Sequence, residues 1–559
     1  MIGEPVTRTP ASNAPGGGSA LGAALIRPRQ VEKRPPCSGS CLGGGDTRGW
    51  ISVVAQRRQL GLSDHEAYRR AWNLLSAVNP FPATLGRICP HPCEDGCSRA
   101  GKDGAVAVNA MERFLGDWAL EHRLPLQRLA DAGTRPEHVG VIGAGPAGLS
   151  FACQMARRGY RATVYEKAER AGGMLYYGIP EYRLPEGVIE SEILRILDLG
   201  VDLRLRTAVG RDVTLPELRA RHGVVFLAIG AGRGLRLGIP GEDGPGTWTG
   251  TEFLSRLNCA QPIALGSRVV VVGGGNTAID AARAARRSGA QVTLMYRRTR
   301  DEMPAIAAEV DEAIAEGVDL RLLVAPVEIV RDGGVVRSVV IERTELAGPD
   351  ESGRRRVVPV AGSAHQVATD SVIAAVSQQP DWEGLGEVAP NGNWLSAGDR
   401  GEFADGVWTG GDVLGPGVAA LAIRQGREAA EAVHAGLTGM PIAASPQPTA
   451  VAPEAVKAVS YDARQRAAGA RSPVDQWRQR PDAEVHSTMS EAEFLSEASR
   501  CFSCGLCFGC ERCFMFCNAG AFTRLEQVAP GAYYALSTDA CEACAKCIDL
   551  CPCGFLERS

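Results

Sequence analysis

The sequence has no run of about 18 apolar residues, the length that a membrane-spanning helix needs, so we expect no transmembrane helix. It also lacks a large excess of either charge: 60 lysines and arginines stand against 64 acidic residues, and the formal net charge is −4. This balance argues against binding to nucleic acid or to a membrane surface. Residues 1–30 lack the basic segment and apolar core of a signal peptide. We therefore expect them to be a disordered tail and the protein to be cytoplasmic.

Cysteine, in contrast, is abundant, and its 18 residues are clustered. Five lie between Cys37 and Cys97 and eleven between Cys501 and Cys553. In a long chain without a signal peptide, such clusters are more often metal or redox ligands than disulfides. The two cysteines outside the clusters, Cys153 and Cys259, are expected to be buried apolar fillers.

A nucleotide-binding motif is found at residues 139–148, which predict a short apolar strand, a glycine turn and the start of a helix. Gly143 allows the tight turn, Gly145 lets the backbone approach a pyrophosphate, and Gly148 lets the helix pack closely on the strand. The phosphates would then bind the free N–H groups at the helix N-terminus. The next strand ends at Glu166, about 20 residues after the turn, where an acid typically binds a ribose hydroxyl.

The pattern recurs at residues 269–278, where a run of valines leads into Gly273 and Gly275 of a G-x-G-x-x-A motif. The following strand ends in Arg297 and Arg298, at the position that Glu166 occupies in the first motif. Arginine can pair with a 2′-phosphate, which favours NADP(H) over NAD(H). Exposed arginines after strands are common, so NAD(H) stays open as an alternative.

The chain is expected to return to the first fold near residue 371, because residues 407–412 predict a strand that ends beside a carboxylate. One nucleotide-binding domain would therefore be inserted inside another. The opposite charges at matching positions favour a flavin dinucleotide on the first and a nicotinamide on the second. The further residues expected at the two cofactors are Pro146, Ala147, Gly172, Gly173, Gly230, Gly411, Asp412, Asn276 and Thr277.

The five N-terminal cysteines form Cys37-x3-Cys41 and a second group, Cys89, Cys93 and Cys97. They are too many for one tetrahedral zinc ion and fit one 4Fe–4S cluster with one cysteine left over. Zinc remains the alternative on spacing alone.

The C-terminal cysteines contain the most specific pattern, two copies of C-x2-C-x2-C-x3-C. In two-cluster ferredoxins the fourth cysteine of each copy ligates the other cluster. One cluster would be held by Cys507, Cys510, Cys513 and Cys551, and the other by Cys541, Cys544, Cys547 and Cys517. A zinc ribbon or a redox-active dithiol is the alternative. Cys501, Cys504 and Cys553 are surplus and receive no role.

Together these motifs predict an α/β multidomain protein: a helical iron–sulfur domain, two nested Rossmann-like domains for FAD and NAD(P)H, and a C-terminal α+β ferredoxin-like domain. The expected boundaries are a disordered tail over 1–34, the iron–sulfur domain over 35–132, the FAD-binding domain over 133–248 and 371–440, the NAD(P)H-binding domain over 249–370, a linker over 441–485, and the ferredoxin domain over 486–559.

The sequence resembles the small-subunit family of bacterial glutamate synthase, in particular its branch with an appended ferredoxin domain. The resemblance extends from Cys37 to Gly554. It is carried by six stretches: Gly143–Gly148, Gly172–Pro180, Gly273–Asp280, Tyr296–Arg298, Gly410–Asp412 and Gly86–Pro90.

The resemblance implies FAD on the first nucleotide fold, with Glu166 at its adenosine ribose and Asp412 near its ribityl chain. It implies NADPH on the inserted fold, with Arg297 and Arg298 near the 2′-phosphate. It also implies an N-terminal 4Fe–4S centre held by Cys41, Cys89, Cys93 and Cys97.

The larger family often carries a second N-terminal centre, which uses a cysteine pair shortly before Cys37. Residues 30–33 of this chain, Gln-Val-Glu-Lys, lack that pair. We therefore expect three 4Fe–4S clusters in all, with Cys37 and Glu112 as leftovers of the missing centre.

The expected activity is electron transfer between NAD(P)H, FAD and the clusters, in either direction. The flavin exchanges a hydride with the nicotinamide and single electrons with the clusters, so no side-chain acid or nucleophile is expected to be catalytic. Since no domain for a second organic substrate is recognisable, the partner is expected to be a ferredoxin or a separate subunit in a hetero-oligomer. Candidates are a 2-oxoacid:NAD(P) oxidoreductase, a sulfite-reductase-type enzyme and the glutamate synthase large chain.

Three other functions compete with this interpretation. A thioredoxin-reductase-like enzyme would need a C-x-x-C motif in the inserted domain, where Cys259 stands alone. A self-contained small-molecule reductase would need an added substrate domain. A zinc-binding scaffold with vestigial nucleotide folds is the non-enzymatic alternative.

Overall fold

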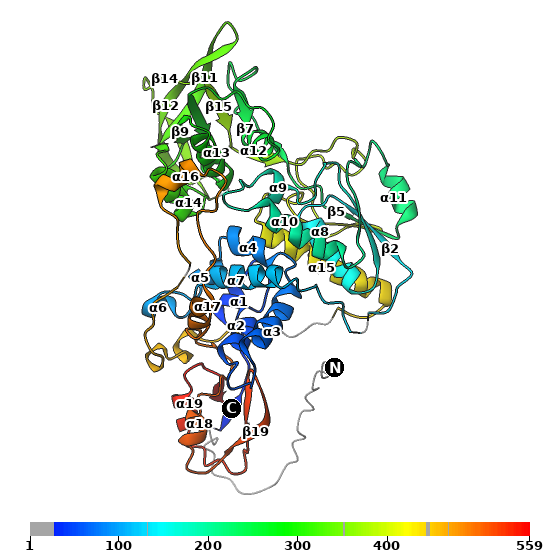
Figure 1. Ribbon diagram of the computed structural model, residues 1–559, viewed down its shortest axis with the longest axis vertical. Coiled ribbons are helices and arrows are strands. Elements are labelled where there is room, and N and C mark those ends of the chain that lie inside the picture. Colours follow the sequence, from blue (N-terminus) through cyan, green and yellow to red (C-terminus); the bar gives the residue numbers. More distant parts are fainter. Residues whose placement is uncertain (1–26, 131, 350–352, 443–447, 468) are drawn as a thin grey trace.

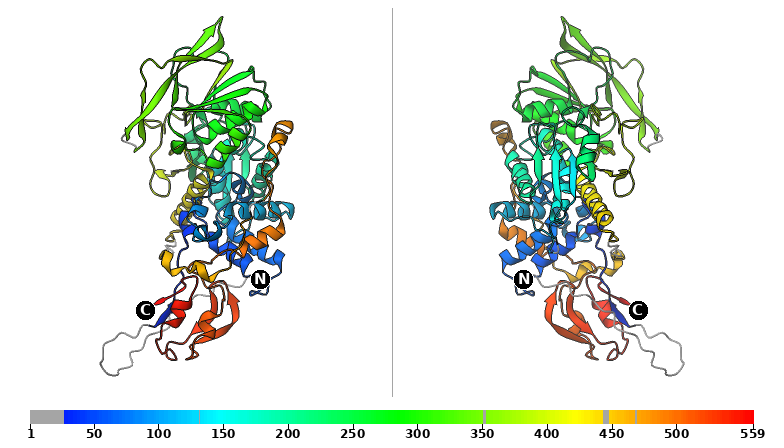
Figure 2. Two further views of the ribbon diagram at one scale, coloured as in Figure 1. Left: turned by 90° about the vertical axis from the view of Figure 1, so that its left-hand side faces the viewer. Right: turned by 90° about the vertical axis from the view of Figure 1, so that its right-hand side faces the viewer.

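The computed structural model describes residues 27–130, 132–349, 353–442, 448–467 and 469–559. Its parts follow one another along the long axis of the molecule, with the hairpins of the inserted domain at one end and the C-terminal residues at the other (Figures 1 and 2). Most of the expected N-terminal tail, residues 1–26, lies outside the described residues.

The N-terminal region is helical. Its helices are α1 (Pro36–Ser40), α2 (Thr47–Ala55), α3 (Asp64–Ser76), α4 (Pro82–Ile88), α5 (Pro92–Asp95), α6 (Ala100–Asp103) and α7 (Val108–Glu121). Ser63 and Glu66 begin α3 with a capping box, each side chain satisfying a free N–H of the first turn. Helices α4 and α7 cross at glycines: a Cβ on Gly86 would lie 2.4 Å from the Cα of Arg113. The crossing therefore depends on the absence of a side chain there.

The first nucleotide-binding domain contains a six-stranded sheet in the order β17-β18-β5-β2-β3-β4. The strands are β2 (His138–Ile142), β3 (Arg161–Tyr165), β4 (Asp202–Arg204), β5 (Val224–Leu227), β17 (Glu402–Ala404) and β18 (Val407–Thr409), all parallel except β17. The helices are α8 (Pro146–Arg157), α9 (Met174–Tyr177), α10 (Glu186–Leu197), α11 (Leu215–Arg221) and α15 (Ala419–Thr438). All four residues of β5 are buried, as expected for a central parallel strand covered on both faces.

The inserted domain has a parallel sheet in the order β10-β9-β8-β15-β7 and a separate antiparallel sheet. The first contains β7 (Thr247–Thr249), β8 (Arg268–Val272), β9 (Gln291–Tyr296), β10 (Asp319–Leu322) and β15 (Ser371–Ala374). The second contains β11 (Val324–Asp332), β12 (Val335–Pro349), β13 (Arg355–Pro359) and β14 (His365–Ala368). The helices are α12 (Gly250–Asn258), α13 (Asn276–Arg287), the 3-10 turn η1 (Arg300–Glu302) and α14 (Ala307–Ala315).

The boundaries that we expected for the inserted domain, 249 and 370, are corrected by this sheet. Strand β15 begins at Ser371 and lies between β8 and β7, so it belongs to the inserted domain. Strand β7 also belongs there, although it begins at Thr247. The chain crosses between the two domains at the short pair β6 (Arg233–Gly234) and β16 (Gln378–Gln379). An apolar run predicts a buried strand but not the sheet that it joins, because its partners are distant in sequence.

The C-terminal region also differs from the expected linker and separate domain. Residues 448–505 include the turns η2 (Pro453–Ala455) and η3 (Ala458–Ser460) and the helices α16 (Val474–Gln479) and α17 (Glu491–Ala498). Phe494 of α17 stacks on Phe114 of α7, with ring centroids 4.2 Å apart. Arg500, which is fully buried, donates to the carbonyl of Ala105 and pairs with Asp103. This segment therefore completes the core of the N-terminal helical region.

Residues 506–559, the terminal unit, contain α18 (Arg512–Met515), β19 (Phe522–Ala529), β20 (Ala532–Leu536), α19 (Lys546–Leu550) and β21 (Leu556–Arg558). Strand β21 pairs antiparallel with β1 (Pro28–Gln30). The last part of the expected 1–34 tail is thus an ordered strand. Lys33 fixes it further, because its Nζ donates to the Gly554 carbonyl and pairs with Glu557.

A buried ion-pair network, the clamp, joins both nucleotide-binding domains to residues 471–486. Nη1 of Arg183 in the first domain donates to both carboxylate oxygens of Asp280 in α13, at 2.7 and 2.8 Å. Arg287 of α13 donates to the Pro481 carbonyl, and its guanidinium lies 3.8 Å from the ring centre of Tyr182. Part of the expected linker therefore packs against the clamp and helps to hold the two nucleotide-binding domains together. None of the helices in the described ranges is both long and apolar enough to cross a membrane.

Candidate nucleotide and iron–sulfur sites

The glycine turn between β2 and α8 has the geometry of a phosphate cradle. Gly143 has φ +102°, and a Cβ there would lie 2.3 Å from the Ala228 carbonyl oxygen. A Cβ on Gly148 would lie 2.0 Å from the Gly143 carbonyl oxygen, so the helix can pack on the turn only without a side chain. At Gly145 a Cβ would meet nothing within 4 Å. The free space at Gly145, directly before the Pro146 N-terminus of α8, is where a pyrophosphate would fit.

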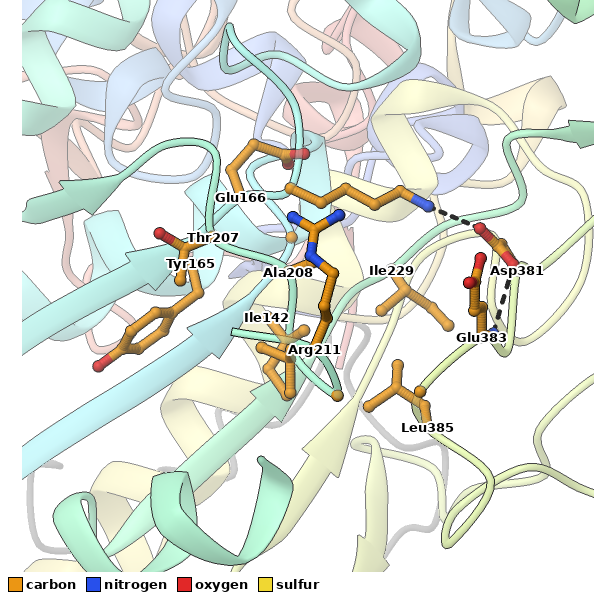
Figure 3. A pocket seen from close by; sticks show the side chains of 15 residues that line it. Ile142, Tyr165, Glu166, Thr207, Ala208, Arg211, Ile229, Asp381, Glu383 and Leu385 are labelled. Atoms are coloured by element: carbon orange, nitrogen blue, oxygen red, sulfur yellow. Dashed lines mark hydrogen bonds and ion pairs between the residues drawn. The ribbon is translucent and has the colours of Figure 1, made fainter. Parts of the chain in front are cut away.

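Glu166 lies at the end of β3 beside this turn. Its two carboxylate oxygens each accept a 2.8 Å hydrogen bond from a backbone N–H, of Ala144 and of Ala168. Glu166, Arg211 and Asp381 line a cavity of about 470 Å³ that opens at the ends of β2 and β3 (Figure 3). Because each carboxylate oxygen has a second lone pair, Glu166 can still accept a ribose hydroxyl.

Two further loops close around the cradle. A Cβ on Gly173 (φ +54°) would lie 3.0 Å from the Cα of Gly145, and the N–H of Gly172 donates to the Ala144 carbonyl. Gly230, at the end of β5, has φ +66° and open space around it.

Gly411 and Asp412 follow β18, and Gly411 lies close to the start of α8. A Cβ on Gly411 would lie 3.0 Å from that of Ala147, at the start of α8. Burial raises the pKa of Asp412 to about 6, although the Gly417 N–H opposes the shift. A carboxyl group is therefore held in a poorly solvated position next to the nucleotide site.

The sequence reasoning overlooked Gly426 in α15. A Cβ there would lie 2.2 Å from the carbonyl oxygen of Ala147, so α15 can press its backbone against the start of α8. A glycine within an otherwise helical pattern was the available signal, because it usually has a packing reason.

The second glycine turn, between β8 and α13, repeats this geometry. Gly273 has φ +147°, with a hypothetical Cβ 2.2 Å from the Ala375 carbonyl oxygen, whereas a Cβ on Gly275 would meet only the Cγ of Pro304, at 4.0 Å. Asn276 begins α13, and its Oδ1 accepts a 3.0 Å hydrogen bond from the Ile306 N–H. Thr277 packs against Gly250 at the start of α12. The turn can therefore receive a second pyrophosphate.

The two arginines after β9 have different environments. Arg298 is 8% exposed, and its Nε donates to the Arg355 carbonyl at 3.0 Å. Arg297 is exposed. Of the two, Arg297 has the guanidinium that is accessible to a ligand.

Three of the four expected N-terminal ligands lie together, beside Glu112. Burial, then Glu112 and Cys41, raise the pKa of Cys89 to about 12. The pKa of Cys93 is raised further by burial and by the charges of Glu94, Glu112, Cys41 and Cys89. Glu112 accepts a hydrogen bond from Asn79 at 2.8 Å, and burial raises its pKa to about 8. Glu112, which we had expected to be a leftover of the missing second centre, is therefore the carboxyl group beside these three thiols.

Cys97, the fourth expected ligand, belongs to a different group. Burial is the largest cause of the raised pKa of Cys37, Cys501 and Cys504, and the charge of Cys97 raises all three further. The grouping follows from packing: a Cβ on Gly96 would lie 2.7 Å from the Oγ of Ser40, so the turn before Cys97 rests on α1, which contains Cys37. The expected ligand set is corrected accordingly. Cys501 and Cys504, which received no role from the sequence, complete this group of four.

The cysteines of the terminal unit lie in two groups, and the crossed ligand sets that their spacing predicts stay a prediction. Burial and the charges of Cys507, Cys510 and Cys551 raise the pKa of Cys513 to about 12. Burial and the charges of Cys541, Cys544 and Cys517 raise the pKa of Cys547 to about 11. Within the described ranges, no three His, Cys, Asp or Glu side chains are close enough to hold a single metal ion. A cubane is a larger body, and its four thiolates stand further apart than the ligands of one ion.

Comparison with known families identifies the nucleotide-binding part. The profile of the pyridine nucleotide-disulphide oxidoreductases matches residues 137–426, which is more than half of the chain. The chain belongs to this family. A second profile, dihydropyrimidine dehydrogenase domain II with a 4Fe-4S cluster, matches residues 30–124. This pyridine nucleotide-disulphide oxidoreductase thus carries an N-terminal iron–sulfur domain.

Several curated relatives match about two thirds of this chain. The NADP(+)-dependent formate dehydrogenase subunit beta of Moorella thermoacetica is 38% identical over 71% of this chain and 59% of its own length. The NADPH-Fe(3+) oxidoreductase subunit beta of Geobacter sulfurreducens is 39% identical over 62% of this chain and 51% of its own length. The glutamate synthase [NADPH] small chain of Escherichia coli is 35% identical over 71% of this chain and 88% of its own length. The chain therefore spans little more than half of the first two relatives and most of the third.

Proposed function

We propose that the protein transfers electrons between NADP(H) and a partner redox enzyme or ferredoxin, as the flavin- and iron–sulfur-containing subunit of a larger complex. The observation that carries the proposal is the combination of two glycine cradles, at Gly145 and Gly275, with grouped cysteine thiols in one chain. Bound FAD would exchange electron pairs with the nicotinamide and single electrons with the clusters. The printed names of the three relatives, all subunits or chains of NADP(H) enzymes, support it.

The first cradle fits FAD. The open side of Gly145 and the N-terminus of α8 would bind the pyrophosphate, and Glu166 would accept the ribose hydroxyls. Asp412, in its poorly solvated position, would bind the ribityl chain. The thiols nearest the N-terminus fit a cubane at Cys41, Cys89 and Cys93, with Glu112 beside them, and the terminal unit fits two more.

The second cradle fits NADPH. Exposed Arg297 would pair with the 2′-phosphate, whereas Arg298 is held by the Arg355 carbonyl. Replacing Arg297 with alanine should raise the KM for NADPH roughly tenfold or more, since a charge-assisted hydrogen bond contributes about 1.5–3 kcal/mol. The KM for NADH should stay unchanged, because NADH has no 2′-phosphate.

The measurement is the steady-state reduction of a one-electron dye by each nucleotide. Val335→Ala, at an exposed position of the same domain, is the control and should leave both KM values unchanged. An unchanged KM for NADPH in Arg297→Ala would remove the assignment of this arginine.

The partner is proposed by class. A 2-oxoacid oxidoreductase would deliver or receive electrons through the terminal unit. Isolation of the native complex and identification of its subunits tests this: a redox enzyme at fixed stoichiometry supports the proposal, and a single-subunit protein contradicts it.

The small chain of a glutamate synthase is the second candidate, because the match spans 88% of the Escherichia coli chain. Glutamine-dependent formation of glutamate by the isolated complex would identify it. A zinc-binding scaffold is tested by metal analysis of anaerobically purified protein, in which zinc without acid-labile sulfide would overturn the electron-transfer function.

A further inference from the structure

Cys501 and Cys504 lie in a backbone turn that occurs three times in the C-terminal region. In Cys501–Gly505 the left-handed residues are Ser503 (φ +52°) and Gly505 (φ +72°). The same positions are left-handed in the first ferredoxin motif, at Gly509 and Glu511, and in the second, at Ala543 and Ala545. Non-glycine residues rarely adopt this conformation, and they do so mostly where function or packing requires it.

The turn directs a backbone N–H toward the first sulfur. The Ser503 N–H lies 3.4 Å from the Sγ of Cys501, as the Ala543 N–H does from the Sγ of Cys541. N–H groups that point at a cysteine sulfur stabilise thiolate charge, and in iron–sulfur sites they tune the cluster. Cys501–Cys504 therefore has the local geometry of the two predicted cluster motifs.

The remaining two thiols come from the N-terminal helical region. The Sγ of Cys504 donates to the Oγ of Ser98 at 3.4 Å, and Ser98 is the sequence neighbour of Cys97. The turn before Cys97 rests on α1, which contains Cys37: a Cβ on Gly96 would lie 2.7 Å from the Oγ of Ser40 and 3.5 Å from the Pro36 carbonyl oxygen. Four buried or half-buried thiols thus converge from three segments of the chain.

A buried cation accompanies this group. The Arg48 side chain is 3% exposed and donates to the carbonyls of Cys504 and Lys33. Arg48 also pairs with the carboxylate of Glu32 at 2.7 Å. It therefore anchors the backbone of Cys504 to the N-terminal segment that contains Glu32 and Lys33.

We propose that Cys37, Cys97, Cys501 and Cys504 hold a further 4Fe–4S cluster, at the junction between the N-terminal helical region and the terminal unit. The site is composite, because half of its ligands lie more than 400 residues downstream of the other half. This inference goes beyond the proposed function, and it rests only on the ability of the chain to bind iron–sulfur clusters.

The first test counts iron. The variant Cys501→Ala/Cys504→Ala, purified without oxygen, should lose about four iron and four sulfide per chain relative to the unaltered protein, with the same FAD content. Cys37→Ala should lose the same four iron and four sulfide. The variant with all three substitutions should lose no more iron than either of the other two variants. Cys259→Ala, at a cysteine outside all four groups, is the matched control and should keep all its iron. An unchanged iron content in the pair variant, or losses that add in the triple variant, would overturn the proposal.

The second test uses the unaltered protein and so does not depend on a variant that folds. Alkylation under anaerobic conditions, read by mass spectrometry, should spare Cys37, Cys97, Cys501 and Cys504 until iron is removed with a chelator, and should then label all four together. Cys259 should be labelled equally before and after chelation. Labelling of Cys501 and Cys504 in the iron-loaded protein, while Cys89 and Cys93 stay protected, would contradict the composite site.

The two proposals can fail separately. A protein that oxidises NADPH but has a reactive Cys501–Cys504 pair retains the proposed function and lacks the composite cluster. A protein with the four protected thiols but no FAD or NADPH oxidation has the cluster and a different activity.

Discussion

Glycines in the first nucleotide turn have separate tasks that single substitutions can distinguish. Gly148→Ala places a methyl group 2.0 Å from a backbone oxygen, so the turn or the helix must shift, at a cost of roughly 1–3 kcal/mol. Gly145→Ala meets no protein atom within 4 Å, and its φ of −82° suits alanine. The methyl group would instead occupy the space assigned to the pyrophosphate.

We therefore expect Gly148→Ala to lower the melting temperature even without bound flavin. Gly145→Ala should melt like the unaltered flavin-free protein and retain much less FAD after gel filtration. Melting curves of the flavin-free proteins and FAD per chain are the measurements. Equal FAD retention in Gly145→Ala would contradict the location of the phosphate site.

The glycine turns were predictable from sequence because their information is local, and the crossed cysteine sets of the terminal unit, which stay a prediction, rest on equally local spacing. A turn needs Gly143, Gly145 and Gly148 within six residues, and each ferredoxin copy spans eleven. The grouping of Cys97 with Cys501 was not predictable in this way. It depends on the approach of Cys504 to Ser98, which are 406 positions apart in the sequence and meet only in the folded chain.

Among the elements, α16 is a short helix whose importance its sequence does not reveal. Residues 441–485 are rich in proline and alanine, which is typical of a linker. Trp477 of α16 is nevertheless 2% exposed and packs with Tyr182 and Val485. Its ring also lies beside the guanidinium groups of Arg283 and Arg471. The helix thus covers one side of the clamp between the two nucleotide-binding domains.

Trp477→Ala should destabilise the clamp by about 3–5 kcal/mol, the usual cost of removing a buried tryptophan side chain. The expected result is faster cleavage within residues 471–486 in limited proteolysis, with peptides identified by mass spectrometry. Val459→Ala, at a position that is 90% exposed, is the control and should be cut like the unaltered protein. Equal cleavage rates for the two variants would show that α16 does not hold the clamp closed.

Strand β15 is a second element whose place in the fold could not be predicted from sequence. The sequence predicted a return to the first fold near residue 371, whereas β15 pairs with β8 and β7 of the inserted domain. Parallel neighbours are joined through long crossovers, so the order of strands depends on packing that no local pattern contains.

For the whole molecule, residue 505 lies near the boundary between the part of the chain that the fold requires and the terminal unit, which it does not require. Residues 448–505 contribute Met489, Phe494 and Ala498 to the same core as Trp50 and Tyr68 of the N-terminal helices. The terminal unit has its own small core around Phe522, Tyr533 and Tyr534. The expected domain boundary at 486 would cut through the helical region.

Truncation after residue 505 should therefore leave a protein that folds and retains FAD. Truncation after residue 440 should give an insoluble or FAD-free product, because it exposes the core that α17 covers. Soluble yield, FAD per chain and melting temperature distinguish the two truncated proteins. A stable, flavin-loaded product of the shorter truncation would refute the shared core.

The pairing of β1 with β21 also has a consequence during synthesis. Leu556 is translated more than 500 residues after its partner Gln30. At about 5–20 residues per second, the first strand waits roughly half a minute to two minutes for the second. The nascent chain thus exposes an unpaired edge during that interval, a state in which chaperone protection would matter most.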